Sequence, residues 1–209
     1  MTLINIAPTK SSLLTLKHQL AVAHEGYELL EQKRQILVFE LMARVKRAGE
    51  VNRQVDQSLA SAYSALREAT LDIGSRALDE AARSVRLDHR VQVESRQLMG
   101  LRLPGVTAST QTPDVQFGVG GTSTNTDLAF QRFTGSLPLL AELAELETAV
   151  LRLAAELRKT QRRCNALDKV FIPNTRQTII FITASLEERE RESFVITRMA
   201  RDRLGKSEP

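Results

Sequence analysis

The stretch LLTLKHQLAVAHEGYELL, residues 13–30, decides the fold, because its apolar side chains recur at alternating steps of three and four residues. This spacing places them on one face of an α-helix, as in the seam of a coiled coil. The predicted seam of the first arm consists of Leu13, Leu16, Leu20, Ala23, Tyr27, Leu30, Leu37, Leu41, Ala48, Val51, Val55, Leu59, Ala62, Leu66, Ala69 and Ile73. A long helix that pairs with another helix therefore follows from the pattern.

A second arm near the C-terminus repeats the pattern, with Ser136 as the expected N-cap and Pro138 in the first turn. Pro173 lacks the N–H that would bond the carbonyl of Lys169, so we expect a kink or an irregular turn there. The predicted second seam consists of Leu143, Leu146, Val150, Leu153, Leu157, Thr160, Cys164, Leu167, Phe171, Asn174, Thr178 and Phe181, and continues through Ile182, Leu186 and Phe194.

The part between the arms, residues 100–136, holds six of the ten glycines and many Ser and Thr residues, which favours turns over helix. The predicted fold is all-α: a long antiparallel two-helix coiled coil, with a knob of loops and a possible short β-hairpin in the middle. The predicted segments are a tail (1–11), a helix (12–99), the knob (100–136), a helix (137–204) and a second tail (205–209).

The composition narrows the function classes. Aromatic residues make up only 4% and Trp is absent, which fits a narrow aliphatic seam better than a globular core. The single cysteine excludes an internal disulfide and fits a cytoplasmic setting. The net charge of +4 comes from mixed signs in both arms, so no nucleic-acid partner is expected. No segment is long and apolar enough for direct membrane insertion.

Candidates for catalysis are few, and we predict no catalytic, cofactor-binding or metal-binding residue. His18, His24 and His89 do not form a ligand pattern with one another or with Cys164, and each is interpreted as a surface or packing residue. The segment Gly118–Ser123 resembles a phosphate loop only superficially, since it lacks the lysine.

Three charged clusters are candidates for docking an acidic or basic partner, although a solvated helix face is the simpler interpretation of each. They are the basic set Arg44, Lys46 and Arg47, the basic set Arg158, Lys159, Arg162 and Arg163, and the mixed run Glu187–Glu192.

Several short motifs occur along both arms and at the start of the middle segment. They are Pro8–Ser11, Leu14, Leu16–Lys17, Leu20, Gly26, Leu29–Leu30, Lys33–Arg34, Glu40, Met99–Pro104, Arg162–Pro173, Thr178–Ile179, Ile182, Leu186–Glu188 and Glu190–Phe194. Together these residues resemble the D subunit of V-type and archaeal-type rotary ATPases. Cys164 and Asp168 stand where that family usually has Val and Glu.

The resemblance implies a non-catalytic central rotor shaft that couples ATP hydrolysis or synthesis to ion translocation. Its paired terminal helices would enter the ring of catalytic A and B subunits. Its other end would bind the F subunit and dock on the funnel-shaped C/d subunit above the membrane ring, which makes the protein peripheral to the membrane. The alternative from the residues alone is a free-standing coiled-coil scaffold or tether, commonly a parallel dimer.

Overall fold

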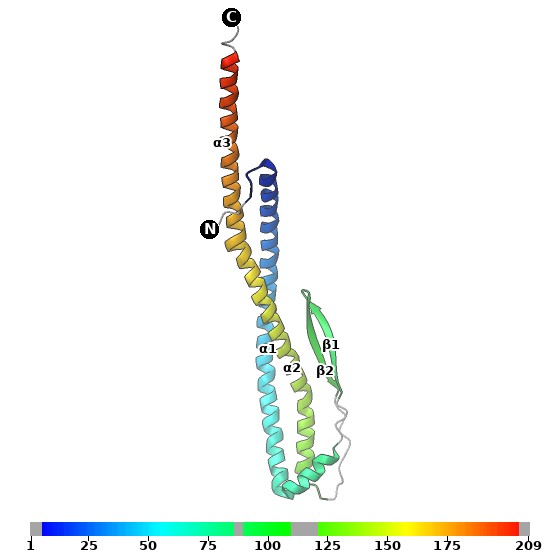
Figure 1. Cartoon of the computed structure of the whole chain (residues 1–209). Coiled ribbons are helices and arrows are strands. Elements are labelled where there is room, and N and C mark those ends of the chain that lie inside the picture. Colours follow the sequence, from blue (N-terminus) through cyan, green and yellow to red (C-terminus); the bar gives the residue numbers. More distant parts are fainter. Residues whose placement is uncertain (1–5, 86–89, 110–120, 205–209) are drawn as a thin grey trace. The chain divides into compact units, whose positions relative to one another are not determined.

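The computed structural model describes residues 6–85, 90–109 and 121–204. By its contacts the chain divides into two compact units, one of residues 37–157 and one of residues 1–36 with 158–209. The elements, drawn in Figure 1, are α1 (Lys10–Ser84), β1 (Arg90–Leu98), β2 (Leu101–Ser109), α2 (Thr124–Ala166), the π-helical turn η1 (Leu167–Phe171) and α3 (Ile172–Leu204). None of the helices in these ranges is long and apolar enough to cross a bilayer.

The unit of residues 37–157 pairs α1 with α2 in opposite directions. Arg47 of α1 contacts Glu142 of α2, and farther along α1 the carbonyl of Ser61 accepts a hydrogen bond from Arg132. The residue numbers rise on one helix as they fall on the other, which confirms the predicted antiparallel arrangement. Leu37, Leu103, Ala149 and Leu153 form a buried hydrophobic cluster in this unit.

The other unit pairs the start of α1 with α3. Lys10 Nζ lies 2.7 Å from Glu190 Oε1, and Arg189 donates a hydrogen bond to the carbonyl of Pro8. Leu16 and Ala23 of α1 and Cys164 and Ile182 of the second arm are buried in this unit. The predicted seam of the first arm is confirmed, because every one of its positions is buried or half-buried.

The irregular turn expected near Pro173 is present as η1, in which the N–H of Ile172 bonds the carbonyl of Leu167. A π-turn adds one residue to a helical turn and so rotates the following face. Of the predicted seam positions beyond the π-turn, Thr178 and Ile182 are buried, and Asn174 and Leu186 are half-buried. The prediction is wrong at Phe171, Phe181 and Phe194, which are 39%, 50% and 70% exposed, and it did not include the buried Thr175.

The hydroxyl of Thr175 is buried and has no hydrogen-bond partner among the described residues. Because an unsatisfied buried hydroxyl is destabilising, Thr175→Val is expected to raise the free energy of unfolding by about 1–2 kcal/mol. Chemical denaturation measures this change. Thr178→Val is the matched control, because the buried Thr178 hydroxyl donates a hydrogen bond to the carbonyl of Asn174, 2.8 Å away. This variant should not raise the free energy of unfolding. A lower free energy of unfolding for Thr175→Val would contradict the interpretation that the Thr175 hydroxyl is unsatisfied.

The predicted boundaries around the middle segment need correction. Residues 90–98 belong to β1 instead of the first helix, and the second helix begins at Thr124 instead of residue 137. Ser136 is therefore not an N-cap: it lies inside α2, where its hydroxyl donates to the carbonyl of Phe133. The knob is thus a β-hairpin that starts ten residues earlier than expected.

The first helix contains a break at Gly74, whose φ of 80° and ψ of 158° are not helical. A positive φ with an extended ψ is accessible almost only to glycine, so Gly74 determines where α1 bends. The sequence pattern predicts a continuous helix through this glycine, and the structure corrects that prediction. Beyond the bend, the last turns of α1 pack beside the start of α2, as the apolar pocket described below records.

Candidate interaction surfaces

Potential catalytic groups do not converge in the described residues. His18 and His24 are exposed on α1, and His89 lies outside the described residues, as do Gly118–Gly120 of the glycine-rich segment. Gly121 has a positive φ, and the carbonyl of Ser123 accepts the N–H of Thr126 in the first turn of α2. The described residues contain no group of His, Cys, Asp and Glu side chains that could hold a metal.

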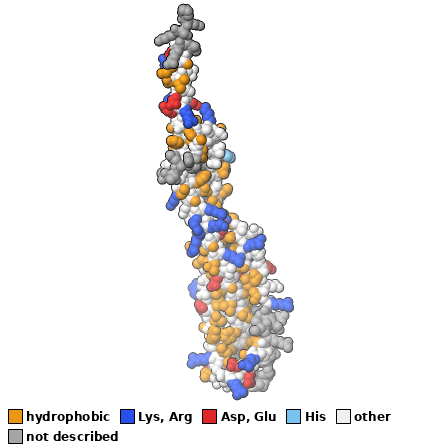
Figure 2. All heavy atoms as spheres, viewed as in Figure 1, with side chains coloured by type: hydrophobic (Ala, Val, Ile, Leu, Met, Phe, Trp, Pro, Cys, Tyr) orange, Lys and Arg blue, Asp and Glu red, His pale blue; other side chains and the backbone are white. Residues whose placement is uncertain are grey.

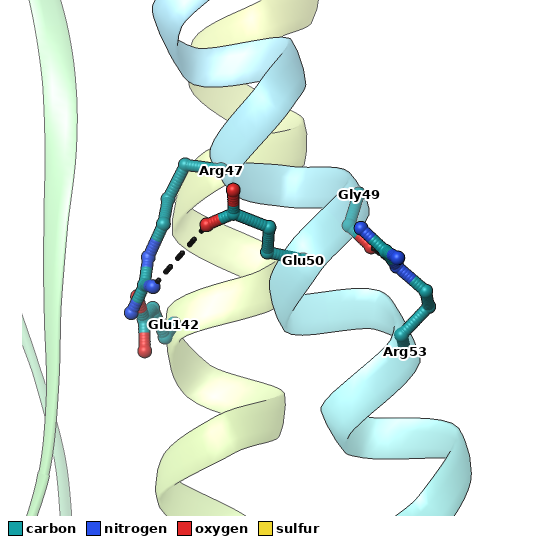
Figure 3. Close-up of polar contacts among 5 residues, drawn as sticks. All are labelled: Arg47, Gly49, Glu50, Arg53 and Glu142. Carbon is teal, nitrogen blue, oxygen red and sulfur yellow. Dashed lines mark hydrogen bonds and ion pairs between the residues drawn. The ribbon is translucent and has the colours of Figure 1, made fainter.

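The first basic cluster takes part in ion pairs. Figure 3 shows Arg47 reaching from α1 toward Glu142 of α2, with Glu50 on its own helix also close. The hydrogen bonds to Glu142 raise the pKa of the Arg47 guanidinium. Arg44 pairs with Glu40 one turn earlier. These pairs are half-exposed and contribute little stability, but Arg47 and Glu142 help set the register of the two helices.

Cys164 lies in a partly polar stretch of the seam near the ion pair of Arg34 and Glu31. Burial raises the pKa of the Cys164 thiol, and the nearby Glu31 carboxylate raises it further. The negative charge of Asp168 is the main cause that raises the pKa of Tyr27. Both groups are therefore protonated at neutral pH, and the thiol is a packing group with low reactivity.

The second basic cluster and the mixed run are largely solvent-exposed, as the simpler interpretation predicted. The mixed run also contacts α1: the Lys10 ammonium, hydrogen-bonded to Glu190, lowers the pKa of that carboxyl. Arg191 pairs with Glu187 and Glu188 on its own helix. The pairing of α1 with α3 therefore ends at this run, where Lys10 and Glu190 form an ion pair between the two helices.

Beyond this run, α3 continues with no contact to another helix recorded among the described residues. The side chains of Phe194, Val195, Ile196 and Met199 are all exposed, with Phe194 at 70%. Figure 2 shows hydrophobic side chains on this part of α3, beyond the charged run. We call Phe194, Val195, Ile196 and Met199 the terminal surface. Exposed apolar side chains distributed around a helix in this way are typical of a segment that packs on partner proteins.

At the bend of α1, apolar side chains line an open pocket of about 170 Å³. Leu66 lies before the bend, Leu78 after it, and Phe130 comes from α2. Phe133, also in the lining, makes an edge-to-face contact with Tyr63, with ring centroids 5.2 Å apart. We call this region, Leu66–Val85 with residues 124–133, the three-helix end; it offers a second apolar surface.

The β-hairpin is fixed to α2 at two points. The N–H of Val106 donates to Glu145 Oε2 at 2.7 Å, and Arg152 Nη1 donates to the carbonyl of Arg102 at 2.6 Å. Leu103 of β2 is buried in the core between α1 and α2. Figure 1 shows the hairpin beside α2 within this unit. The possible short hairpin of the sequence prediction is therefore present, and it is a positioned element of the unit.

Comparison with known proteins gives a consistent result over nearly the whole chain. The family model for the D subunit of ATP synthase matches residues 12–202. The D subunit of the A-type ATP synthase of Methanosphaera stadtmanae is 37% identical over 206 residues, covering 97% of this chain and 96% of the relative.

Two bacterial proteins are similar to a comparable degree. One of the V-type ATP synthase D subunits of Treponema pallidum, the one numbered 2, is 38% identical over 198 residues, with 95% of both chains covered. The D subunit of the V-type ATP synthase of Thermotoga neapolitana is 30% identical over 203 residues, with 97% of this chain and all of the relative covered. The matches thus include both long helices and the hairpin.

Proposed function

The chain belongs to the family of ATP synthase D subunits, and from this premise we propose that it is the central rotor shaft of a V/A-type ATP synthase. The observation that carries the proposal is the extent of the match, which runs from the start of α1 to the last turn of α3. The D subunit is a non-catalytic stalk component of that complex.

In this role the shaft couples ATP hydrolysis or synthesis to ion translocation by rotating inside the catalytic ring. An asymmetric shaft contacts each site of the ring differently, so each orientation favours a different conformation of each site. The narrow seam of buried Leu16, Leu37, Val51, Leu153 and Ile182 supports this role, because it holds the two helices of each unit together along their lengths.

The terminal surface is the part that we assign to the ring of A and B subunits. Its apolar side chains have no covering element among the described residues, and the helix pairing ends just before it. We assign the three-helix end to the F subunit and to the funnel-shaped C/d subunit. Its apolar pocket, lined by Leu78 and Phe130, is of a size that admits an apolar side chain of a partner.

Removing apolar groups from the terminal surface should weaken association with the ring while the fold is retained. We expect the double variant Phe194→Ser and Ile196→Ser to recover A and B subunits at least about tenfold less efficiently, since buried apolar side chains contribute roughly 1.5–3 kcal/mol each. Leu151→Ser is the matched control, because Leu151 is 71% exposed on α2. Equal recovery by both variants would argue against this assignment.

The proposal as a whole is tested by purifying the tagged chain from its source cells. We expect catalytic A and B subunits to copurify in a complex with ATPase activity. The alternative, a free-standing coiled-coil tether, predicts recovery of copies of this chain alone. The antiparallel pairing of helices within one chain already disfavours that alternative, since tethers are commonly parallel dimers.

A further inference from the structure

One edge of the β-hairpin has backbone groups without partners. β1 and β2 pair in register from Arg90↔Ser109 to Leu98↔Leu101. Met99 and Gly100, both with positive φ, form the two-residue turn. In such a hairpin the pair that flanks the turn exchanges hydrogen bonds, and every second pair then does the same. The even-numbered residues of β1 therefore bond to β2, and the odd-numbered ones direct their N–H and C=O groups outward.

The contacts of β2 agree with this assignment. Its even-numbered residues should face away from β1, and these are the residues that meet α2: the Val106 N–H donates to Glu145, and the Arg102 carbonyl accepts from Arg152. Between them, Pro104 has no N–H to satisfy. The outward edge of β2 is thus occupied or blocked at three successive positions.

The outward edge of β1 has no comparable protection. Among the described residues, no hydrogen bond is recorded for the outward groups of Val91, Val93, Ser95 and Gln97. Exposed edge strands are usually protected by proline, charged side chains, a bulge or a covering element. The segment 91–97 has neither proline nor a bulge, and its charged residues Glu94 and Arg96 project from the face opposite to that of Val91 and Val93. Its apolar residues Val91 and Val93 are 60% and 68% exposed.

We propose that β1 accepts an extended strand of a neighbouring protein of the complex, which adds to the hairpin as a third strand. This inference rests on membership of the ATP synthase complex, which supplies the neighbour. A row of outward N–H and C=O groups at every second residue is matched by a β-strand, whereas a helix leaves it unpaired. Val91 and Val93 point to one face of the sheet, so the added strand should place apolar residues beside them.

A second copy of this chain fits the edge poorly in two registers. Antiparallel self-pairing centred on Glu94 places two carboxylates directly opposite each other, and self-pairing centred on Val93 places Arg90 opposite Arg96. The register centred on Ser95 places Glu94 opposite Arg96 and is the one of these three that charge favours. Self-pairing in that register predicts protection of the free chain that rises with its concentration, whereas a strand of a neighbouring protein predicts protection in the complex alone.

Hydrogen exchange with residue resolution tests the proposal, applied to the free chain and to the purified complex. We expect the amides of Val91, Val93, Ser95 and Gln97 to exchange at least about tenfold more slowly in the complex than in the free chain. The even-numbered amides of β1 should be protected in both. Equal exchange of the odd-numbered amides in both samples would overturn the proposal, as would protection in the free chain, whether constant or rising with its concentration.

A proline substitution separates the hydrogen bonds from the side chains. Val93→Pro removes an outward N–H that the hairpin itself does not use, at a position equivalent to that of Pro104 on the other strand. We expect it to abolish the slow exchange of Val91 and Ser95 in the complex while the even-numbered amides stay protected. Val93→Thr keeps the N–H and should retain most of the protection. If the complex assembles and hydrolyses ATP without edge protection, only this inference fails and the proposed function stands.

Discussion

Leu153→Asp is expected to lower the free energy of unfolding of the 37–157 unit by at least about 3 kcal/mol. Leu153 is fully buried and packs with Leu37, Ala149 and Leu103, so it joins α1, α2 and the hairpin in one cluster. The substitution removes this apolar contact and also places a carboxylate among apolar side chains. Because three elements share the cluster, the loss should affect the whole unit.

Thermal unfolding followed by circular dichroism measures the effect, which should lower the midpoint of that unit by roughly 10 °C. Leu151→Asp is the control, because Leu151 is two residues away on the same helix and 71% exposed. It should change the midpoint by no more than a few degrees. Equal shifts for the two variants would mean that Leu153 does not anchor the core.

The helix pairing was predictable from the sequence because it depends on a repeated spacing. Leu16, Leu37, Val51 and Leu153 fall where the three-four pattern places them, and each is buried. A seam of this kind extends over many turns, so one unfavourable residue, such as Gly49, does not obscure it. The antiparallel direction also followed from the lengths of the two arms.

A short hairpin was predicted as possible, but its position was wrong, because its strand signal is short and follows a strong helix signal. Val91 and Val93 alternate with polar residues, and Met99–Gly100 supplies a turn, which together could have indicated a hairpin from residue 90. The bend at Gly74 depends on a backbone conformation that the residue permits but does not require. The hydrogen bonds that fix the hairpin to Glu145 and Arg152 join residues far apart in the chain, so no local sequence pattern predicts them.

The exposed seam positions near and beyond η1 have a different cause. Pro173 signals an irregular turn, but a kink, a break and a π-turn all accommodate a missing N–H. The spacing alone therefore does not predict that Thr175 is buried and Phe181 is exposed. The interaction surfaces were hardest to predict, because exposed apolar residues such as Phe194 look the same in sequence as seam residues.

Locking the terminal part of α3 to the catalytic ring is expected to stop ATP hydrolysis without altering a catalytic residue. Arg201 is exposed near the end of α3, beyond the terminal surface. Arg201→Cys, combined with a cysteine on the facing protein of the ring, would form a disulfide on oxidation when the sulfur atoms meet. A Cys164→Ala background removes the native thiol, whose burial already raises its pKa.

The decisive measurement is the steady-state hydrolysis rate of the assembled complex before oxidation, after oxidation and after reduction. If the chain is the rotor, the rate falls at least about tenfold on oxidation and returns on reduction, because each site of the ring waits for the shaft to turn. Complexes with only one of the two cysteines should keep their rate throughout. A cross-link formed in high yield with unchanged, sustained hydrolysis would contradict the rotor role and indicate a static scaffold.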